Sequence, residues 1–124
     1  MKPTDKDAPH ADFEMAELLA RVDNDRELLR ELLDIFKEDT PRHLETLRDA
    51  VARGDAAKVA SEAHALRGML SNLSAKKAAA AAGTLERLAG QGHAGDFAVC
   101  FSLLEQQIRE LIPEIEACLS GVGS

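Results

Sequence analysis

The chain has 124 residues and a mass of 13.4 kDa, a length that predicts a single domain and excludes a two-domain enzyme. Hydrophobic residues make up 45% and charged residues 30% of the chain, a balance typical of a folded globular protein with a real core. A formal net charge of -7 and four Phe without Trp or Tyr argue against binding to nucleic acid or to an anionic membrane surface.

The lack of a recognisable targeting signal and the cysteine content favour the cytoplasm. No apolar run reaches the roughly 18 residues that a membrane-spanning helix needs, and residues 1–13 lack the apolar segment of a secretory signal. Cys100 and Cys118 share one predicted helix, about 27 Å apart along its axis, which is too far for a disulfide. We therefore expect two buried, reduced thiols in a cytoplasmic protein.

Helices are the only elements that the sequence pattern predicts. Leu and Ala recur at helical spacing, whereas no segment alternates between apolar and polar residues with a period of two. We expect one helical domain over 12–120, with flexible tails at 1–11 and 121–124. Its first helix, over 12–23, is too short to be stable alone and carries four apolar side chains on one face: Met15, Leu18, Leu19 and Val22.

The second predicted helix is long and contains a proline. A capping box formed by Asn24 and Glu27 begins this helix, and Gly54 ends it. The apolar stripe keeps its phase on both sides of Pro41, which predicts one kinked helix instead of two. In its first half the stripe is widened by further apolar residues: Leu28, Leu32 and Ile35. We expect the short first helix to cover this widened part.

Three more helices complete the predicted fold. Asp55 caps the third, whose apolar residues have the alternating spacing of four and three that is typical of a bundle seam: Val59, Ala63, Leu66, Leu70 and Leu73. The fourth helix covers 75–90 and is rich in Ala, and Asp96 caps the fifth. Because the connecting loops are short, consecutive helices should be antiparallel neighbours. The prediction is an all-α, up-down-up-down four-helix bundle with a short extra N-terminal helix.

The side of the third helix that faces away from the core carries a histidine and a cation among small residues. At 100° per residue, this side contains Ala57, Ala60, Ser61, His64, Arg67, Gly68 and Ser71. Gly68 costs a helix about 1 kcal/mol relative to Ala, which suggests that another molecule approaches closely beside His64. Arg67 is a cation that can pair with phosphoryl oxygens. An exposed histidine is usually inert, but this combination indicates an acceptor site for a phosphoryl group.

This part of the sequence resembles the signature of the histidine phosphotransfer (HPt) domains of two-component phosphorelays. The matching residues are His64-Ala65-Leu66-Arg67-Gly68 and Leu73-Ser74-Ala75. The pairs Gly54-Asp55 and Leu85-Glu86 also stand where the family tends to place such residues, so the resemblance covers nearly the whole chain. Arg67 replaces the usual Lys, and Ser74 replaces the usual Gly but can itself cap the following helix.

The resemblance implies a phosphoryl carrier without a kinase site of its own. His64 accepts the group from the aspartyl phosphate of one receiver domain and passes it to the aspartate of another, and the receiver supplies the metal. Arg67 and Gly68 support the phosphoryl group, and Glu86 on the next helix steadies the imidazole unless it is only a solvated surface charge. Docking uses the first and third helices, through Met15, Leu18, Leu19, Ala60, Ser61 and Ser71.

Other kinds of site find no support in the sequence. The glycine-rich stretch 90–95 follows a helix instead of a strand, so we interpret it as a linker and not as a phosphate-binding loop. None of the four His has a Glu three residues before it, which argues against a metal site in the bundle. We therefore expect no metal and no cofactor, and we interpret His10, His43 and His93 as surface histidines.

Two functions stay open at this point. One is a phosphoryl carrier that acts through His64, and the other is an interaction module that binds and restrains a protein partner through the same helix face. We expect a cytoplasmic monomer that binds receiver domains but neither nucleic acid nor a membrane. The chain is either free-standing or the C-terminal domain of a hybrid sensor kinase, which can be membrane-bound.

Overall fold

The computed structural model describes residues 15–117 and 119, and every element within them is helical. The elements are α2 (Met15–Arg21), α3 (Arg26–Arg53), α4 (Ala56–Asn72), α5 (Lys76–Gly90), the short 3₁₀ helix η2 (Ala94–Asp96) and α6 (Phe97–Ala117). The all-α fold class is thereby confirmed. The expected tails at 1–11 and 121–124, the start of the first helix and Cys118 lie outside the described residues.

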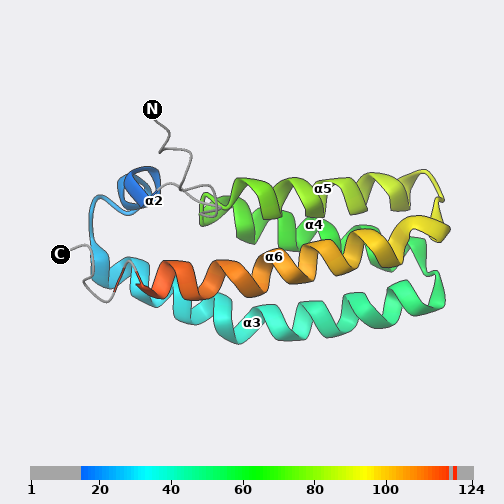
Figure 1. The fold of residues 1–124 in the computed structure, drawn as a ribbon, viewed down its shortest axis with the longest axis horizontal. Coiled ribbons are helices and arrows are strands. Elements are labelled where there is room, and N and C mark those ends of the chain that lie inside the picture. The colour runs from blue at the N-terminus through cyan, green and yellow to red at the C-terminus, as the bar shows by residue number, and fades with distance from the viewer. Residues whose placement is uncertain (1–14, 118, 120–124) are drawn as a thin grey trace, which may run out of the picture.

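Four long helices form an antiparallel bundle (Figure 1). α3 and α5 run in one direction along the bundle and α4 and α6 in the other, with consecutive helices side by side. Contact between α3 and α6 closes the bundle. α2 lies across the end where α3 begins and α4 ends, and both figures show it nearly along its axis. The predicted up-down-up-down bundle with a short extra N-terminal helix is confirmed.

The helix α3 begins one residue later than the predicted capping box. Asp25 is its N-cap, and a carboxylate oxygen of Asp25 accepts a 3.0 Å hydrogen bond from the backbone N–H of Leu28. Asn24, the predicted cap, has a φ of 60° and donates its backbone N–H to the carbonyl of Leu19. The prediction was wrong here because Asn24 ends α2, in a left-handed conformation that Asn tolerates better than most residues.

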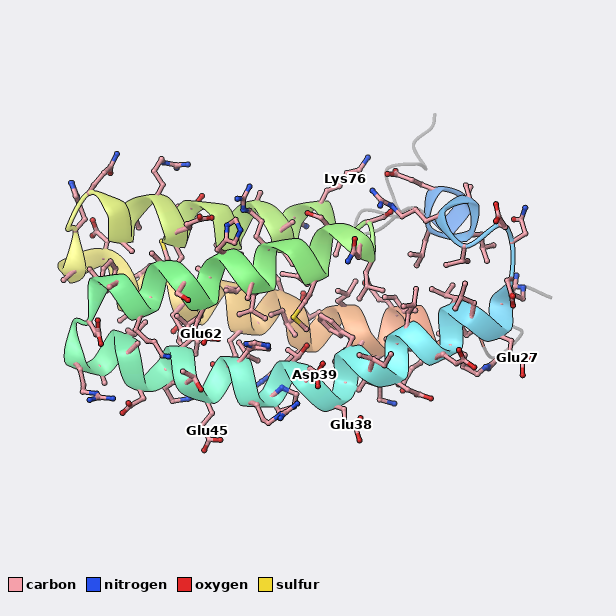
Figure 2. All side chains as sticks on the ribbon, turned by 180° about the vertical axis from the view of Figure 1, so that it is seen from behind. Glu27, Glu38, Asp39, Glu45, Glu62 and Lys76 are labelled. Carbon is pink, nitrogen blue, oxygen red and sulfur yellow. The ribbon has the colours of Figure 1, made fainter. Side chains whose placement is uncertain are left out.

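The helix α3 is a single helix of 28 residues that passes through Pro41, as the phase of its apolar stripe predicts. In Figure 2 the axis of α3 changes direction near Asp39, just before the proline, which removes one backbone hydrogen bond. Gly54 ends the helix with a φ of 65°, and Asp55 then caps α4. This short connection places α4 antiparallel to α3.

The predicted seam of α4 lies in the core, with Val59, Ala63, Leu66, Leu70 and Leu73 all buried. The buried stripe of α6 lines the same core: Phe97, Phe101, Leu104, Ile108, Leu111 and Ile115. α5 contributes mainly Ala, which allows close approach to its neighbours. Asp96 lies inside η2, so the predicted cap of the last helix is replaced by a 3₁₀ turn that leads directly into α6.

Ser74 occupies the turn between α4 and α5 in a left-handed conformation, with a φ of 56°. Gly is the usual residue for such a backbone because a Cβ is unfavourable there. Ser74 is buried, and its hydroxyl accepts a 2.9 Å hydrogen bond from Nε of Arg21. The expected capping role of Ser74 is wrong, since Ala75 is the N-cap of α5 and makes no side-chain cap bond. The hydroxyl instead ties α2 to the bundle.

In the part of the chain that the structure describes, no helix is long and apolar enough to cross a membrane. Cys100 is a free, half-buried thiol that packs against the core.

Candidate functional site

His64 lies in the middle of α4, on the side opposite the buried seam, and its side chain is 65% exposed. The residues around it on this side are small, polar or cationic: Ala57, Ser61, Arg67, Gly68 and Ser71 are exposed, and Ala60 is half-buried. A Cβ added to Gly68 would meet no other atom within 4 Å. The imidazole is therefore open to a second molecule.

The helix α5 brings Glu86 beside this imidazole. Oε2 of Glu86 lies 3.0 Å from Nδ1 of His64, and Oε1 of Glu86 lies 3.1 Å from Nε of Arg67. Nη2 of Arg67 lies 3.2 Å from the same Nδ1 atom. Arg67 and His64 are neighbours on one helix, whereas Glu86 comes from the antiparallel neighbour. The three side chains therefore form one polar network that joins α4 to α5.

The two partners of Nδ1 require opposite protonation of that atom. A carboxylate only accepts hydrogen bonds, so the contact with Glu86 requires a proton on Nδ1. A guanidinium only donates, so the contact with Arg67 requires a lone pair there. When a neutral His64 donates to Glu86, its lone pair is on Nε2, which has no hydrogen-bond partner among the described residues. Nε2 is then the nitrogen that can attack an electrophile.

Cationic side chains line a groove of about 340 Å³ beside this network, where α2 meets the turn between α4 and α5. Arg67 lines the groove together with Arg21 and Lys76. Lys76 pairs with Glu17 at 3.1 Å, which together with the Arg21–Ser74 hydrogen bond holds α2 at this position. With three cations against the carboxylate of Glu17 in its lining, the groove has an excess of positive charge, although the chain as a whole is acidic.

Comparison with known protein families identifies the chain. The family model described as Hpt domain matches residues 31–119. The chain belongs to the Hpt domain family. Histidine-containing phosphotransfer protein B (HptB) from Pseudomonas aeruginosa PAO1 has a crystal structure with the same fold, at a TM-score of 0.81 and 24% identity over 91% of this chain and 96% of that chain. No curated protein matches the sequence.

Membership in the family gives this Hpt domain a role in histidine phosphotransfer within phosphorelays, in which Hpt domains interact with receiver domains. Hpt domains are phosphocarriers without kinase activity. His64, Arg67 and Gly68 on α4 and Glu86 on α5 all lie inside the matched range. The family that the sequence resembles is therefore confirmed.

The expected docking residues of α2 are not all accessible in this Hpt domain. Leu18 is 0% exposed and belongs to the core, so a partner cannot contact it and its expected docking role is wrong. Leu19 is half-buried against the same core, and the side chain of Met15 lies outside the described part. The apolar face of α2 was identified correctly, but this face turns onto the bundle.

Apolar side chains in the first half of α3 lie exposed, contrary to the expectation that α2 covers them. Ile35 is 54% exposed, and Leu28 on the same stripe is also exposed. Leu32 and Met69 line a small groove of about 100 Å³ between α3 and α4. The sequence shows the widened stripe of α3, but the position of a short helix across the end of a bundle cannot be read from periodicity.

The other histidines of this Hpt domain have different surroundings. His43 on α3 is half-buried, and its Nδ1 lies 2.7 Å from Oε1 of Glu62 on α4, so it joins two helices and is not a simple surface histidine. His93 is exposed, 3.9 Å from Asp96, and His10 lies outside the described residues. Within 15–117 and 119, no group of three or more His, Cys, Asp or Glu is arranged to hold a metal ion.

Proposed function

We propose that this Hpt domain accepts a phosphoryl group on Nε2 of His64 from the aspartyl phosphate of one receiver domain and passes it to the aspartate of another. The observation that supports the proposal is the contact of Nδ1 with Glu86, which favours the tautomer with the proton on Nδ1 and the lone pair on Nε2 of an exposed imidazole. His93 is also exposed, but the 3.9 Å between its Nδ1 and Asp96 is too long for a hydrogen bond.

The transfer step uses the lone pair of Nε2. It attacks the phosphorus atom, a nitrogen–phosphorus bond forms, and the bond between phosphorus and the aspartate oxygen breaks, so that the aspartate leaves as a carboxylate. The imidazole then carries a positive charge and keeps its proton on Nδ1. Glu86 accepts a hydrogen bond from that proton and stabilises the cation, while Arg67 offsets the negative charge of the phosphoryl oxygens.

We place the receiver over α4 and the first half of α3. The proposed docking surface consists of Leu28, Leu32, Ile35 and Met69, of the small residues Ala60, Ser61, Gly68 and Ser71 around His64, and of Met15 and Leu19 from α2. A partner would bury the exposed apolar side chains, and the small residues let its backbone approach the imidazole. Leu18 is excluded because it is buried.

The setting of the domain is also part of the proposal. The folded unit is 12–120, and it acts as a cytoplasmic monomer without a kinase site of its own. It is either free-standing or the C-terminal domain of a hybrid sensor kinase. In each case the donor and the acceptor of the phosphoryl group are receiver domains.

The test is incubation with a receiver domain phosphorylated on its aspartate, followed by detection of labelled protein under alkaline conditions, since phosphohistidine is acid-labile. The wild type and the matched control His93→Ala should become labelled, and His64→Ala should not. Labelling of His64→Ala at the wild-type level would contradict the assignment of the site. A wild type that binds the receiver but stays unlabelled would instead favour an interaction module that restrains its partner.

A further inference from the structure

A glycine on α5 makes room for the side chain of Arg67. A Cβ placed on Gly83 would lie 3.3 Å from Cδ of Arg67, closer than ordinary van der Waals contact. Gly90 is the last residue of the same helix, and a Cβ placed there would meet no other atom within 4 Å. The space above Gly83 is therefore occupied by a side chain of the site, whereas the space above Gly90 is free.

The position of Gly83 relative to Glu86 explains why this space is needed. The two residues lie three apart on α5, so they are neighbours on one side of the helix. The side chain of Arg67 starts on α4 and passes over Gly83, and its Nε reaches Oε1 of Glu86 at 3.1 Å. A Cβ at position 83 would require Cδ of Arg67 to shift from this path by a few tenths of an ångström.

The contact between Arg67 and Glu86 divides the carboxylate between two partners. Arg67 binds Oε1, and Oε2 remains for Nδ1 of His64 at 3.0 Å. A guanidinium displaced from Oε1 stays tethered beside His64, where its Nη2 already lies 3.2 Å from Nδ1. Without Oε1 of Glu86 as a competing acceptor for its N–H groups, the guanidinium favours the tautomer with the lone pair on Nδ1 and the proton on Nε2. This tautomer blocks the nitrogen that the proposed function uses.

We infer that Gly83 is a positioning residue: it lets Arg67 bind Glu86 and thereby keeps the proton of His64 on Nδ1. The consequence for phosphotransfer rests on the proposed function, whereas the effect on the tautomer does not. Arg suits this role better than Lys, because the planar guanidinium directs its Nε at Oε1 of Glu86 in a fixed geometry, whereas Lys offers only a point charge.

The experiment compares Gly83→Ala with the matched control Gly90→Ala, each made in the wild type and in Arg67→Ala protein. ¹⁵N NMR of the imidazole reports the tautomer of unphosphorylated His64, and reaction with phosphoramidate reports its phosphorylation without any receiver. Gly83→Ala should increase the tautomer protonated on Nε2 and slow phosphorylation roughly two- to fivefold, the range expected for a partly exposed ion pair. Gly90→Ala should change neither readout, and Gly83→Ala should have no further effect in Arg67→Ala protein.

Equal tautomer populations in Gly83→Ala and Gly90→Ala overturn the inference. An effect of Gly83→Ala that persists in Arg67→Ala protein overturns it as well, because the substitution would then act by another route. Ala is a better helix former than Gly, so Gly83→Ala should stay folded, and thermal melting checks this. Gly83→Ser supplies a second variant with a Cβ. If wild-type His64 is not phosphorylated at all, the proposed function fails, while the tautomer comparison still decides the role of Gly83.

Discussion

Two side chains compete for the Nδ1 atom of His64, and each favours a different tautomer of the imidazole. Helical spacing was sufficient to predict that His64 and Arg67 are exposed neighbours, since both lie on one helix. Glu86 could be predicted only from the family resemblance, because its contact with His64 joins two helices. The role of Gly83 could not be predicted from the sequence, since the space it leaves is filled by a residue of another helix. Contacts between helices are thus the part of the site that periodicity does not contain.

Substitutions of Arg67 test the charge and the geometry of the network separately. Arg67→Lys keeps the positive charge but replaces the planar guanidinium, whose Nε binds Oε1 of Glu86, by a point charge, so the rate of phosphotransfer should fall partly. Arg67→Glu places a carboxylate against Glu86 and against the phosphoryl oxygens, so it should slow transfer more. The measurement is the initial rate of transfer from a phosphorylated receiver. Equal rates in the wild type and both variants would remove Arg67 from the site.

At the scale of the element, the phase of α4 decides which residues are structural and which can react. The alternating spacing of four and three predicted the buried seam correctly, because one stripe of α4 packs into the core along its whole length. The start of α3 was predicted one residue early. Asn24 and Asp25 are both good N-cap residues, and the course of the chain after α2 determines which of them is left-handed.

Two neighbouring positions on α4 test this phase by their effect on stability. Leu66 is fully buried, so Leu66→Ala should lower the free energy of unfolding by about 2–5 kcal/mol through lost burial and a cavity. His64→Ala removes an exposed side chain and should change it by less than about 0.5 kcal/mol. Chemical denaturation of both variants is the measurement. A harmless Leu66→Ala together with an unfolded His64→Ala would mean that α4 is turned the other way.

At Gly68, stability and receiver binding should change in opposite directions. Gly68→Gln should stabilise the helix by up to about 1 kcal/mol, since a Cβ there meets no other atom and Gln favours a helix. The same side chain obstructs the space above His64, so affinity for the receiver should fall, with Gly68→Ala intermediate. Melting temperature, receiver affinity and phosphorylation by phosphoramidate should be compared. Wild-type receiver affinity in Gly68→Gln would show that Gly68 has no steric role.

At the scale of the whole molecule, the bundle separates a charged site from an apolar area beside it. The overall topology was predicted because short loops and amphipathic helices leave few alternatives. The path of α2 was not predicted. Leu18 was therefore expected to be available for docking although it is buried, and Ile35 was expected to be covered although it is exposed. The local charge could not be predicted either, because the net charge of -7 does not reveal that Arg21, Arg67 and Lys76 line one groove.

The proposed docking surface can be tested with a matched pair of exposed apolar residues. Ile35 on α3 is 54% exposed, and Leu103 on α6 is 50% exposed but lies outside the proposed surface. Ile35→Ser should weaken receiver binding roughly tenfold, the effect expected for a residue near the centre of an interface, and Leu103→Ser should leave it unchanged. Both variants should keep the wild-type rate with phosphoramidate. The reverse order of affinities would move the docking surface to α6.

The most direct test of the account is the identity of the atom that carries the phosphoryl group. The wild type labelled with ¹⁵N in its imidazole rings should be phosphorylated by a receiver, kept at alkaline pH and analysed by ³¹P–¹⁵N correlation NMR. We expect one phosphohistidine, at His64, with phosphorus bonded to Nε2 and the proton retained on Nδ1 beside Glu86. Phosphorus bonded to Nδ1 of His64, or to another residue, would contradict it.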